Sequence, residues 1–319
     1  MPGLQLTGLA HRVMRLVGAG QAPSAAGPSI GTTGAWADEV ADRVLARLAA
    51  TERRRWDEVA DARPEARVLL RRRLAATGSV AAVAELAESW DSWAPEVRAV
   101  VLDPIGRSGT AARQTDQTTC GSACLVLLAA AGDPGLAGWL AAGTVPRLGV
   151  PPELGAADPA VLARLASLPA AARYGAVQRV VQHRTNARSV LGLPWPAALG
   201  TPPWGAAREA RFLGLAFRHR LLDDTDTADL APVLDTVARV VEAGVPLPLY
   251  AGGDTSRGWS TAVPRHVVLA VGHGPAGFRV WEPSVGAVVE VSRAELLRGG
   301  APLPALGGWS HLVWAVLPR

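Results

Sequence analysis

The chain of 319 residues has no lysine, and it has only two cysteines, two tyrosines and three phenylalanines. All 32 of its basic residues are therefore arginine. Because almost nothing titrates between histidine and arginine, a formal charge of only +4 produces a pI near 9.9. The high pI is thus no sign of a nucleic-acid partner, and we expect none.

Long apolar runs are also missing. A membrane-spanning helix needs roughly 18 apolar residues, and the nearest candidate, "CLVLLAAAG", stops at Gly132. The first 20 residues interrupt their apolar positions with Gln5, His11 and two arginines, so they lack the apolar centre of a secretory signal. We therefore expect no membrane span and a cytoplasmic location, while export without a cleavable signal stays open.

Metal-binding patterns are absent as well. The sequence contains neither an HExxH motif nor paired CxxC motifs, so we expect no metal site and no cofactor. The two cysteines, Cys120 and Cys124, lie four residues apart at the start of an apolar run. A single helix would hold them too rigidly for a disulfide, so we expect two free thiols.

The order of the predicted elements divides the chain into three parts. Residues 1–34 have the Gly, Ser, Pro and Ala content of a flexible segment, and 35–105 repeat apolar residues at helical spacing. The third part is 106–319, in which 135–230 is predicted to be an insertion of short helices and loops. Short strand-like runs separated by glycine turns come last, as in "RHVVLAVG" and "FRVWEP". Helices first and strands last predict an α+β fold with an antiparallel sheet.

Two arginine triplets, at 53–55 and 71–73, fall within the predicted helices. Such runs can form a basic binding surface, but more often they form a solvated helix face. We predict the solvated face for both.

Cys120 is the candidate nucleophile. It opens the apolar run "CGSACLVLLAAAG" directly after a polar loop, so we expect it at the N-terminus of a helix. A helix N-terminus presents unpaired N–H groups and the positive end of the macrodipole, which favour a thiolate over a thiol. Gly121 is expected to leave space for a substrate beside the sulfur. Cys124, one turn further on, is predicted to pack in the core.

A cysteine nucleophile needs a base that a third group orients. His266 is the best candidate among six histidines, because it heads the run "HVVLAVG" after a polar loop. If 266–272 and 277–282 form a hairpin, Glu282 comes within reach of the imidazole. A surface or core role for His266 is the alternative.

Attack on a carbonyl also needs donors for the negative charge that develops on oxygen. Gln114, six residues before Cys120, can supply its amide N–H from the loop, beside the backbone N–H of Cys120. Gln117 is the rival for this role, and both glutamines could equally be ordinary polar loop residues.

Together these residues resemble the papain-like cysteine peptidases, and among them the type that removes double-glycine leader peptides in bacteriocin exporters. That type has a glutamine and, six residues later, a cysteine followed by glycine at the start of an apolar helix, as in "QTDQTTCGSACLVLL". Much later it has a helix ending in glycine and proline, a strand, and a histidine heading another strand; "VVEAGVPLPLY" and "RHVVLAVG" keep this order. The resemblance covers about 110–319 and is closest at 113–130 and 240–290.

The resemblance implies a papain-like fold, in which an N-terminal helical lobe with the catalytic cysteine at a helix N-terminus packs on a C-terminal antiparallel sheet. It implies that Cys120 is the nucleophile, His266 the base and later the acid, and Gln114 part of the oxyanion hole. Glu282 departs from the aspartate of the family. No transporter segments follow, so we expect a stand-alone protein, and leader-peptide specificity is not implied.

Three functions are compatible with this sequence. The first is a cysteine peptidase acting on peptide or isopeptide bonds of a peptide or protein substrate, with 35–105 as a docking or regulatory module. The second uses the same residues to deamidate glutamine or to transfer acyl groups. The third is a binding module that keeps the fold without activity, and it is suggested by Glu282 in place of aspartate and by the unusual linker region.

Overall fold

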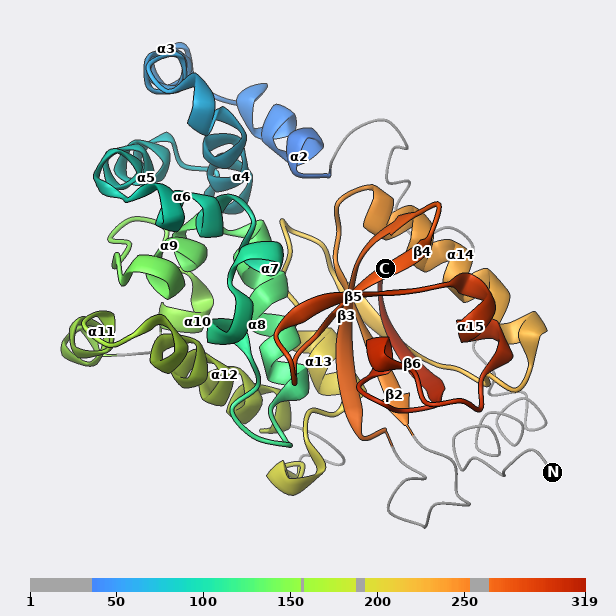
Figure 1. Cartoon of the computed structure of the whole chain (residues 1–319). Helices are drawn as coiled ribbons and strands as arrows, with labels where there is room; N and C mark the ends of the chain where they lie inside the picture. The colour runs from blue at the N-terminus through green and yellow to red at the C-terminus, as the bar shows by residue number, and fades with distance from the viewer. Residues whose placement is uncertain (1–35, 156–157, 188–192, 253–263) are drawn as a thin grey trace.

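The computed structural model describes residues 36–155, 158–187, 193–252 and 264–319 (Figure 1). The segment 1–34, predicted to be flexible, lies outside these residues. In the described part, most helices gather on one side of the molecule and a six-stranded sheet lies on the other. The chain therefore has an α+β fold, as predicted.

The spacing of apolar residues correctly predicts helices before the loop 113–119, which leads into Cys120 and is called the nucleophile loop after the predicted role of that residue. They are α2 (Trp36–Leu45), α3 (Ala50–Asp61), α4 (Arg67–Thr77), α5 (Val80–Ser92), α6 (Pro95–Leu102) and α7 (Pro104–Arg107). α4 ends at Gly78, whose φ of 66° is easily adopted by glycine. α5 follows at once, because the hydroxyl of Ser79 accepts a hydrogen bond from the Ala82 N–H at 3.2 Å and caps the helix.

The next helices form the centre of the helical half. They are α8 (Cys120–Gly132), α9 (Pro134–Ala142), α10 (Pro152–Gly155), α11 (Pro159–Ala166), α12 (Ala170–Asn186) and α13 (Pro203–Glu209). α8 is buried along almost its whole surface, which explains why its sequence has no polar face. Among the described residues no single helix has the length and apolarity to cross a membrane; α8 and α9 together do, but they are bent by 116°.

The strands form one antiparallel sheet in the order β1-β6-β2-β3-β4-β5. They are β1 (Phe217–Leu221), β2 (Leu247–Gly252), β3 (His266–Gly274), β4 (Gly277–Glu282), β5 (Ala287–Val291) and β6 (His311–Pro318). The hairpin of β3 and β4 confirms the prediction for that segment. Two helices accompany the sheet, α14 (Thr227–Glu242), which packs on β2 and β3, and α15 (Arg293–Arg298).

The prediction for 135–230 is wrong near its end, because β1 forms an edge of the sheet there. β1 pairs with β6 at the far end of the chain, from Phe217 opposite Pro318 to Leu221 opposite Trp314. The three residues between Phe217 and Leu221 are partly exposed, since one face of an edge strand is covered incompletely. "FRHRL" therefore lacks the apolar pattern of an inner strand, and a long-range pairing decides its structure.

The second arginine triplet is not a solvated face, contrary to the prediction. Arg73 is 1% exposed, and its guanidinium donates to Asp133 and to the carbonyl oxygen of Leu148, both at 2.7 Å. The same carboxylate accepts from the Gly135 N–H at 3.0 Å and caps α9. A buried ion pair thus joins α4 to the start of α9. The first triplet, 53–55, is exposed as predicted.

α8 lies between the other helices and the sheet (Figure 1). It contacts β2 and β3 on one side and α4, α9 and α12 on the other. Cys120, at its N-terminus, is therefore at the boundary between the two halves. One hydrophobic core extends through both, and the division of the chain at 105 and 106 stays a prediction.

Candidate active site

The loop before α8 is held by its own side chains, and it fixes where the helix begins. A carboxylate oxygen of Asp116 accepts hydrogen bonds from the N–H and the hydroxyl of Thr118, both at 2.7 Å. The hydroxyl of Thr119 accepts from the N–H groups of Thr115 and Asp116 at 3.0 and 3.1 Å. These bonds give the backbone an alternative to the helix up to Thr119, so α8 starts at Cys120.

A second helix, α12, holds the same loop from the other side. The amide nitrogen of Gln178, which is fully buried, donates to the carbonyl oxygens of Ala112 and Arg113 at 3.1 and 2.9 Å. The amide of Gln182 donates to the carbonyl oxygen of Thr118 at 3.0 Å. α12 belongs to the predicted insertion, and no sequence motif indicated that it supports the nucleophile loop.

His266 begins β3, and its imidazole is bonded to Glu282 at the end of β4. Nε2 of His266 and Oε1 of Glu282 are 2.6 Å apart, and the two side chains are 8% and 2% exposed. Glu282 also accepts from the hydroxyl and the N–H of Ser284 at 2.6 and 3.0 Å, and from the N–H of Val285 at 3.0 Å. The structure thus brings together the pair that the hairpin predicts, and three further donors hold the carboxylate in place.

Cys120 and His266 line the same cleft, and the sulfur of Cys120 is one of the groups that raise the pKa of His266. Because Nε2 is bonded to Glu282, Nδ1 is the ring nitrogen left for the sulfur. Burial alone would lower the pKa of His266, but hydrogen bonds to Cys120 and Glu282 outweigh it and raise the pKa to about 9. Burial alone would raise the pKa of Glu282, but hydrogen bonds from His266 and Ser284 lower it to about 2. An imidazolium beside a carboxylate is therefore the stable form at neutral pH.

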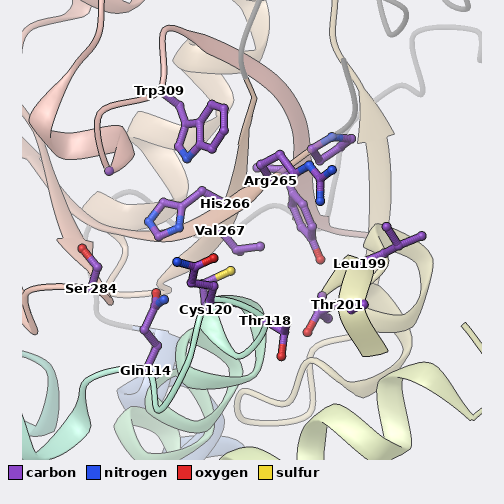
Figure 2. Close-up of a pocket in the computed structure, with 16 residues that line it drawn as sticks. Gln114, Thr118, Cys120, Leu199, Thr201, Arg265, His266, Val267, Ser284 and Trp309 are labelled. Carbon is purple, nitrogen blue, oxygen red and sulfur yellow. The ribbon is translucent and has the colours of Figure 1, made fainter. Parts of the chain in front are cut away.

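The loop after the 3₁₀ turn Pro304–Leu306 covers this pair. Gly307 has a φ of 65°, and a Cβ atom there would lie 2.6 Å from Nε2 of His266 and 3.3 Å from Oε1 of Glu282. Glycine alone allows this close approach of the backbone. Trp309 lies beside the imidazole in the same loop (Figure 2). The loop shields the hydrogen bond between His266 and Glu282 from solvent, in agreement with their low exposure.

A cleft of about 460 Å³ lies at the sulfur, between the sheet and the helical half. His266, Ser284 and Trp309 line one side of it, and the segment 198–201 lines the other (Figure 2). No carboxylate is among the described residues that line it, whereas Arg265 and His266 bring positive charge. Neither the wall 198–201 nor Tyr250, which also lines the cleft, follows from a sequence motif.

Gly121 has a different role from the predicted one. A Cβ atom at this position would lie 2.6 Å from Cβ and 2.8 Å from Oγ1 of Thr201. The space beside the nucleophile is therefore filled by the cleft wall and is not open to a substrate. The absence of a side chain at Gly121 is what lets Thr201 approach the start of α8.

Gln114 and Gln117 both line the cleft. The backbone N–H of Gln114 donates to the carbonyl oxygen of Pro283 at 3.0 Å, which ties the nucleophile loop to the turn after β4. The amide nitrogen of Gln114 donates one hydrogen to the carbonyl oxygen of Asp116 at 2.9 Å and carries a second hydrogen. The structure puts Gln114 at the cleft with an available N–H, and Gln117 stays its rival.

Cys124 lies within the core, and its fully buried thiol donates to the carbonyl oxygen of Val267 at 3.4 Å. Burial raises its pKa well above the ordinary value, so it remains a thiol. Both cysteines are free. The prediction that Cys124 packs in the core is confirmed, whereas Cys120 lines the cleft.

No protein-family model, curated protein or solved structure matches this chain. In the part of the chain that the structure describes, no three His, Cys, Asp or Glu side chains come together in a way that could hold a metal ion. The site thus consists of a thiol and an imidazole that line one cleft, with a carboxylate bonded to the imidazole.

Proposed function

We propose that the protein is a thiol hydrolase of papain-like architecture that cleaves peptide or isopeptide bonds. Its main support is that Cys120 and His266 line one cleft while the imidazole of His266 is bonded to Glu282 at 2.6 Å. A sulfur at a helix N-terminus, an imidazole from a distant strand and an orienting carboxylate are the parts that nucleophilic cysteine catalysis requires. The shared order of motifs with papain-like peptidases supports the same assignment.

The first half of the proposed reaction forms a thioester. With a pKa of about 9 the ring of His266 is protonated at neutral pH, and the sulfur beside it reacts as the thiolate. The thiolate attacks the carbonyl carbon of the substrate, and the backbone N–H of Cys120 and the amide of Gln114 stabilise the negative charge on oxygen. Nδ1 of His266 gives its proton to the leaving nitrogen as the C–N bond breaks.

The second half hydrolyses the thioester. The neutral imidazole of His266 takes a proton from water while the water oxygen attacks the carbonyl carbon. The C–S bond then breaks, which releases the carboxylic acid and restores the thiolate beside an imidazolium. Glu282 stays ionised throughout, because its pKa is about 2, and it orients the ring and stabilises its positive charge.

Two measurements test this function. Limiting iodoacetamide at pH 6.5 is expected to alkylate Cys120 and to spare the buried Cys124, which peptide mapping by mass spectrometry resolves. A mixture of peptides from unfolded proteins should gain new termini with the wild type and none with Cys120→Ala. Equal labelling of both cysteines would contradict the nucleophile assignment, and ammonia release without new termini would reassign the protein to glutamine deamidation.

The oxyanion role has a matched pair of variants. Removing one oxyanion donor costs roughly 10²–10³ in rate, so Gln114→Ala should slow peptide cleavage by that factor. It should leave iodoacetamide labelling of Cys120 unchanged, because alkylation develops no oxyanion. Gln117→Ala is the control and should change neither rate. The reverse result, with Gln117→Ala impaired and Gln114→Ala normal, would transfer the role to the rival.

A further inference from the structure

The cleft contains buried polar atoms that the hydrolytic steps do not use. In the described part of the chain, eight buried side-chain nitrogen and oxygen atoms have no hydrogen-bond partner. Three of these eight atoms belong to residues that line the cleft, and they are Oε1 of Gln114, Oγ1 of Thr201 and the hydroxyl of Tyr250. Native proteins leave few buried polar atoms unpaired, because each is costly, so a cluster of them at one cleft indicates a ligand.

Tyr250 brings its hydroxyl from β2. The residue pairs with Val267 on β3, one position from His266, and it is 2% exposed. Burial raises the pKa of its hydroxyl well above the ordinary value, and Cys120 and Cys124 raise it further. Tyr250 and Cys120 line the same cleft, and the protonated hydroxyl of Tyr250 can donate a hydrogen bond.

Thr201 brings the second hydroxyl from the opposite wall, and it is 5% exposed. Its position is fixed on two sides. The missing side chain of Gly121 admits it to the start of α8, and the carbonyl oxygen of Gly200 accepts from Asn186 Nδ2 at 3.1 Å. Figure 2 shows Thr201 across from Cys120, on the side away from Gln114 and Ser284.

We propose that Thr201 and Tyr250 form a subsite for an uncharged, hydrogen-bonding side chain of the substrate, next to the bond that Cys120 attacks. This inference rests on the proposed function and names its substrate class. The carboxamide of asparagine or glutamine fits best, since its oxygen accepts from Tyr250 and its nitrogen donates to Thr201. An apolar side chain would leave both hydroxyls unpaired, and a carboxylate would bring a second anion beside the thiolate.

The test uses covalent probes on the full chain, so the natural substrate is not required. Dipeptidyl chloromethyl ketones carry glutamine, glutamate or leucine, either next to the ketone or one residue away from it. The second-order rate constant of Cys120 alkylation is measured for each by intact-protein mass spectrometry. At one of the two positions the glutamine probe should react at least about ten-fold faster than the leucine probe, because a site built for hydrogen bonds rejects an analogue without them. Tyr250→Phe and Thr201→Val should each bring this ratio close to one.

Tyr174→Phe is the matched control, because Tyr174 is the other tyrosine of the chain and does not line the cleft. Its buried hydroxyl is bonded to the hydroxyl of Ser108 at 2.6 Å. This variant should keep the glutamine to leucine ratio and lower the melting temperature, since it leaves Ser108 unpaired. Tyr250→Phe should show the opposite, a lost ratio with no loss of thermal stability, because its hydroxyl makes no hydrogen bond in the described part of the chain.

The outcomes separate the two proposals. Equal rates for glutamine and leucine at both positions, or a faster glutamate probe, would overturn the subsite while Cys120 labelling still supports the hydrolase. A ratio that falls equally in Tyr174→Phe would also overturn it, since the effect would then not be local. Failure of every probe to label Cys120 in the folded wild type would overturn the hydrolase, and the subsite with it.

Discussion

The register of the β3–β4 hairpin explains why position 282 needs a side chain as long as glutamate. Leu269 is opposite Trp281, so residue 282 comes opposite residue 268, and His266 lies two residues further along β3. The side chain at 282 must therefore reach the imidazole along a diagonal, which only long side chains span. Glutamate makes the contact at 2.6 Å. Aspartate is shorter by roughly 1.5 Å, one carbon–carbon bond, so its oxygen would be left near the limit of a hydrogen bond or beyond it.

Two substitutions at this position separate the effect of side-chain length from the effect of charge. Glu282→Asp keeps the charge and shortens the side chain, whereas Glu282→Gln keeps the length and removes the charge. A hydrogen bond to a charged group contributes roughly 1.5–3 kcal/mol, so its loss makes protonation of His266 about 10- to 100-fold less favourable. Each variant should therefore lose its imidazolium at a pH about one to two units lower than the wild type, which the pH profile of Cys120 alkylation by iodoacetamide reports.

The pH profile of alkylation gives the stricter test. The pKa of His266 is about 9, so above this pH the imidazolium is lost even in the wild type, and the three proteins should converge. Glu242→Gln is the matched control, because Glu242 contacts His273 Nδ1 at 2.8 Å in the same kind of pair but is exposed. It should react like the wild type at every pH. If Glu282→Gln has the pH profile of the wild type, the carboxylate does not stabilise the imidazolium. If Glu282→Asp has the pH profile of the wild type, the shorter side chain still reaches the imidazole and the argument from side-chain length is wrong.

Three further predictions concern stability and the covering loop. Arg73→Met removes one of two arginines bonded to the buried Asp133 and leaves Arg211 at 3.2 Å, so the free energy of unfolding measured with urea should fall by about 1–3 kcal/mol; a loss under about 0.5 kcal/mol would mean that the pair with Arg73 is dispensable. Gly307→Ala pushes a methyl group against the imidazole, so alkylation of the nucleophile should slow by at least about ten-fold, whereas Gly308→Ala, also at positive φ but with open space around its Cβ, should react normally. The third prediction is the pH dependence of the melting temperature. His266 has its pKa raised from 6.5 to about 9, so its contribution to stability is complete below pH 6.5 and is lost as the pH rises through 9. Glu282 has its pKa lowered from 4.5 to about 2, so its contribution is complete above pH 4.5 and is lost as the pH falls through 2. The melting temperature of the wild type relative to Glu282→Gln should therefore be highest between pH 4.5 and 6.5, and a difference that is constant across pH would contradict the assignment.

Local patterns predicted the helices before Cys120 and the β3–β4 hairpin, because both depend on interactions between residues close in sequence. β1 was missed because its only strong determinant is pairing with β6, almost a hundred residues away. Arg73 was assigned to a solvated face for a similar reason. Its partner carboxylate belongs to a helix sixty residues later in the sequence, and a triplet of arginines does not reveal which member turns inward.

The residues of the candidate site also differ in whether their local sequence or only the fold identifies them. Cys120, His266 and Glu282 were found because each has a type of chemistry that few residues share and a position at the start or end of an element. Tyr250 and Thr201 were missed because nothing in their local sequence distinguishes them from packing residues. Their significance depends on buried, unpaired hydroxyls on two residues that line one cleft, which only the fold reveals.

The helices before Cys120 also help to position the candidate site, which their sequence did not indicate. The distance from sulfur to imidazole depends on how α8 lies against β3, so both ends of α8 must be fixed. The loop bonds of Asp116 and Thr119 fix the N-terminal end. The C-terminal end is fixed by Asp133, which follows α8 directly and is bonded to Arg73 on α4. Through Arg73, the N-terminal helices therefore help to position α8 and, with it, Cys120.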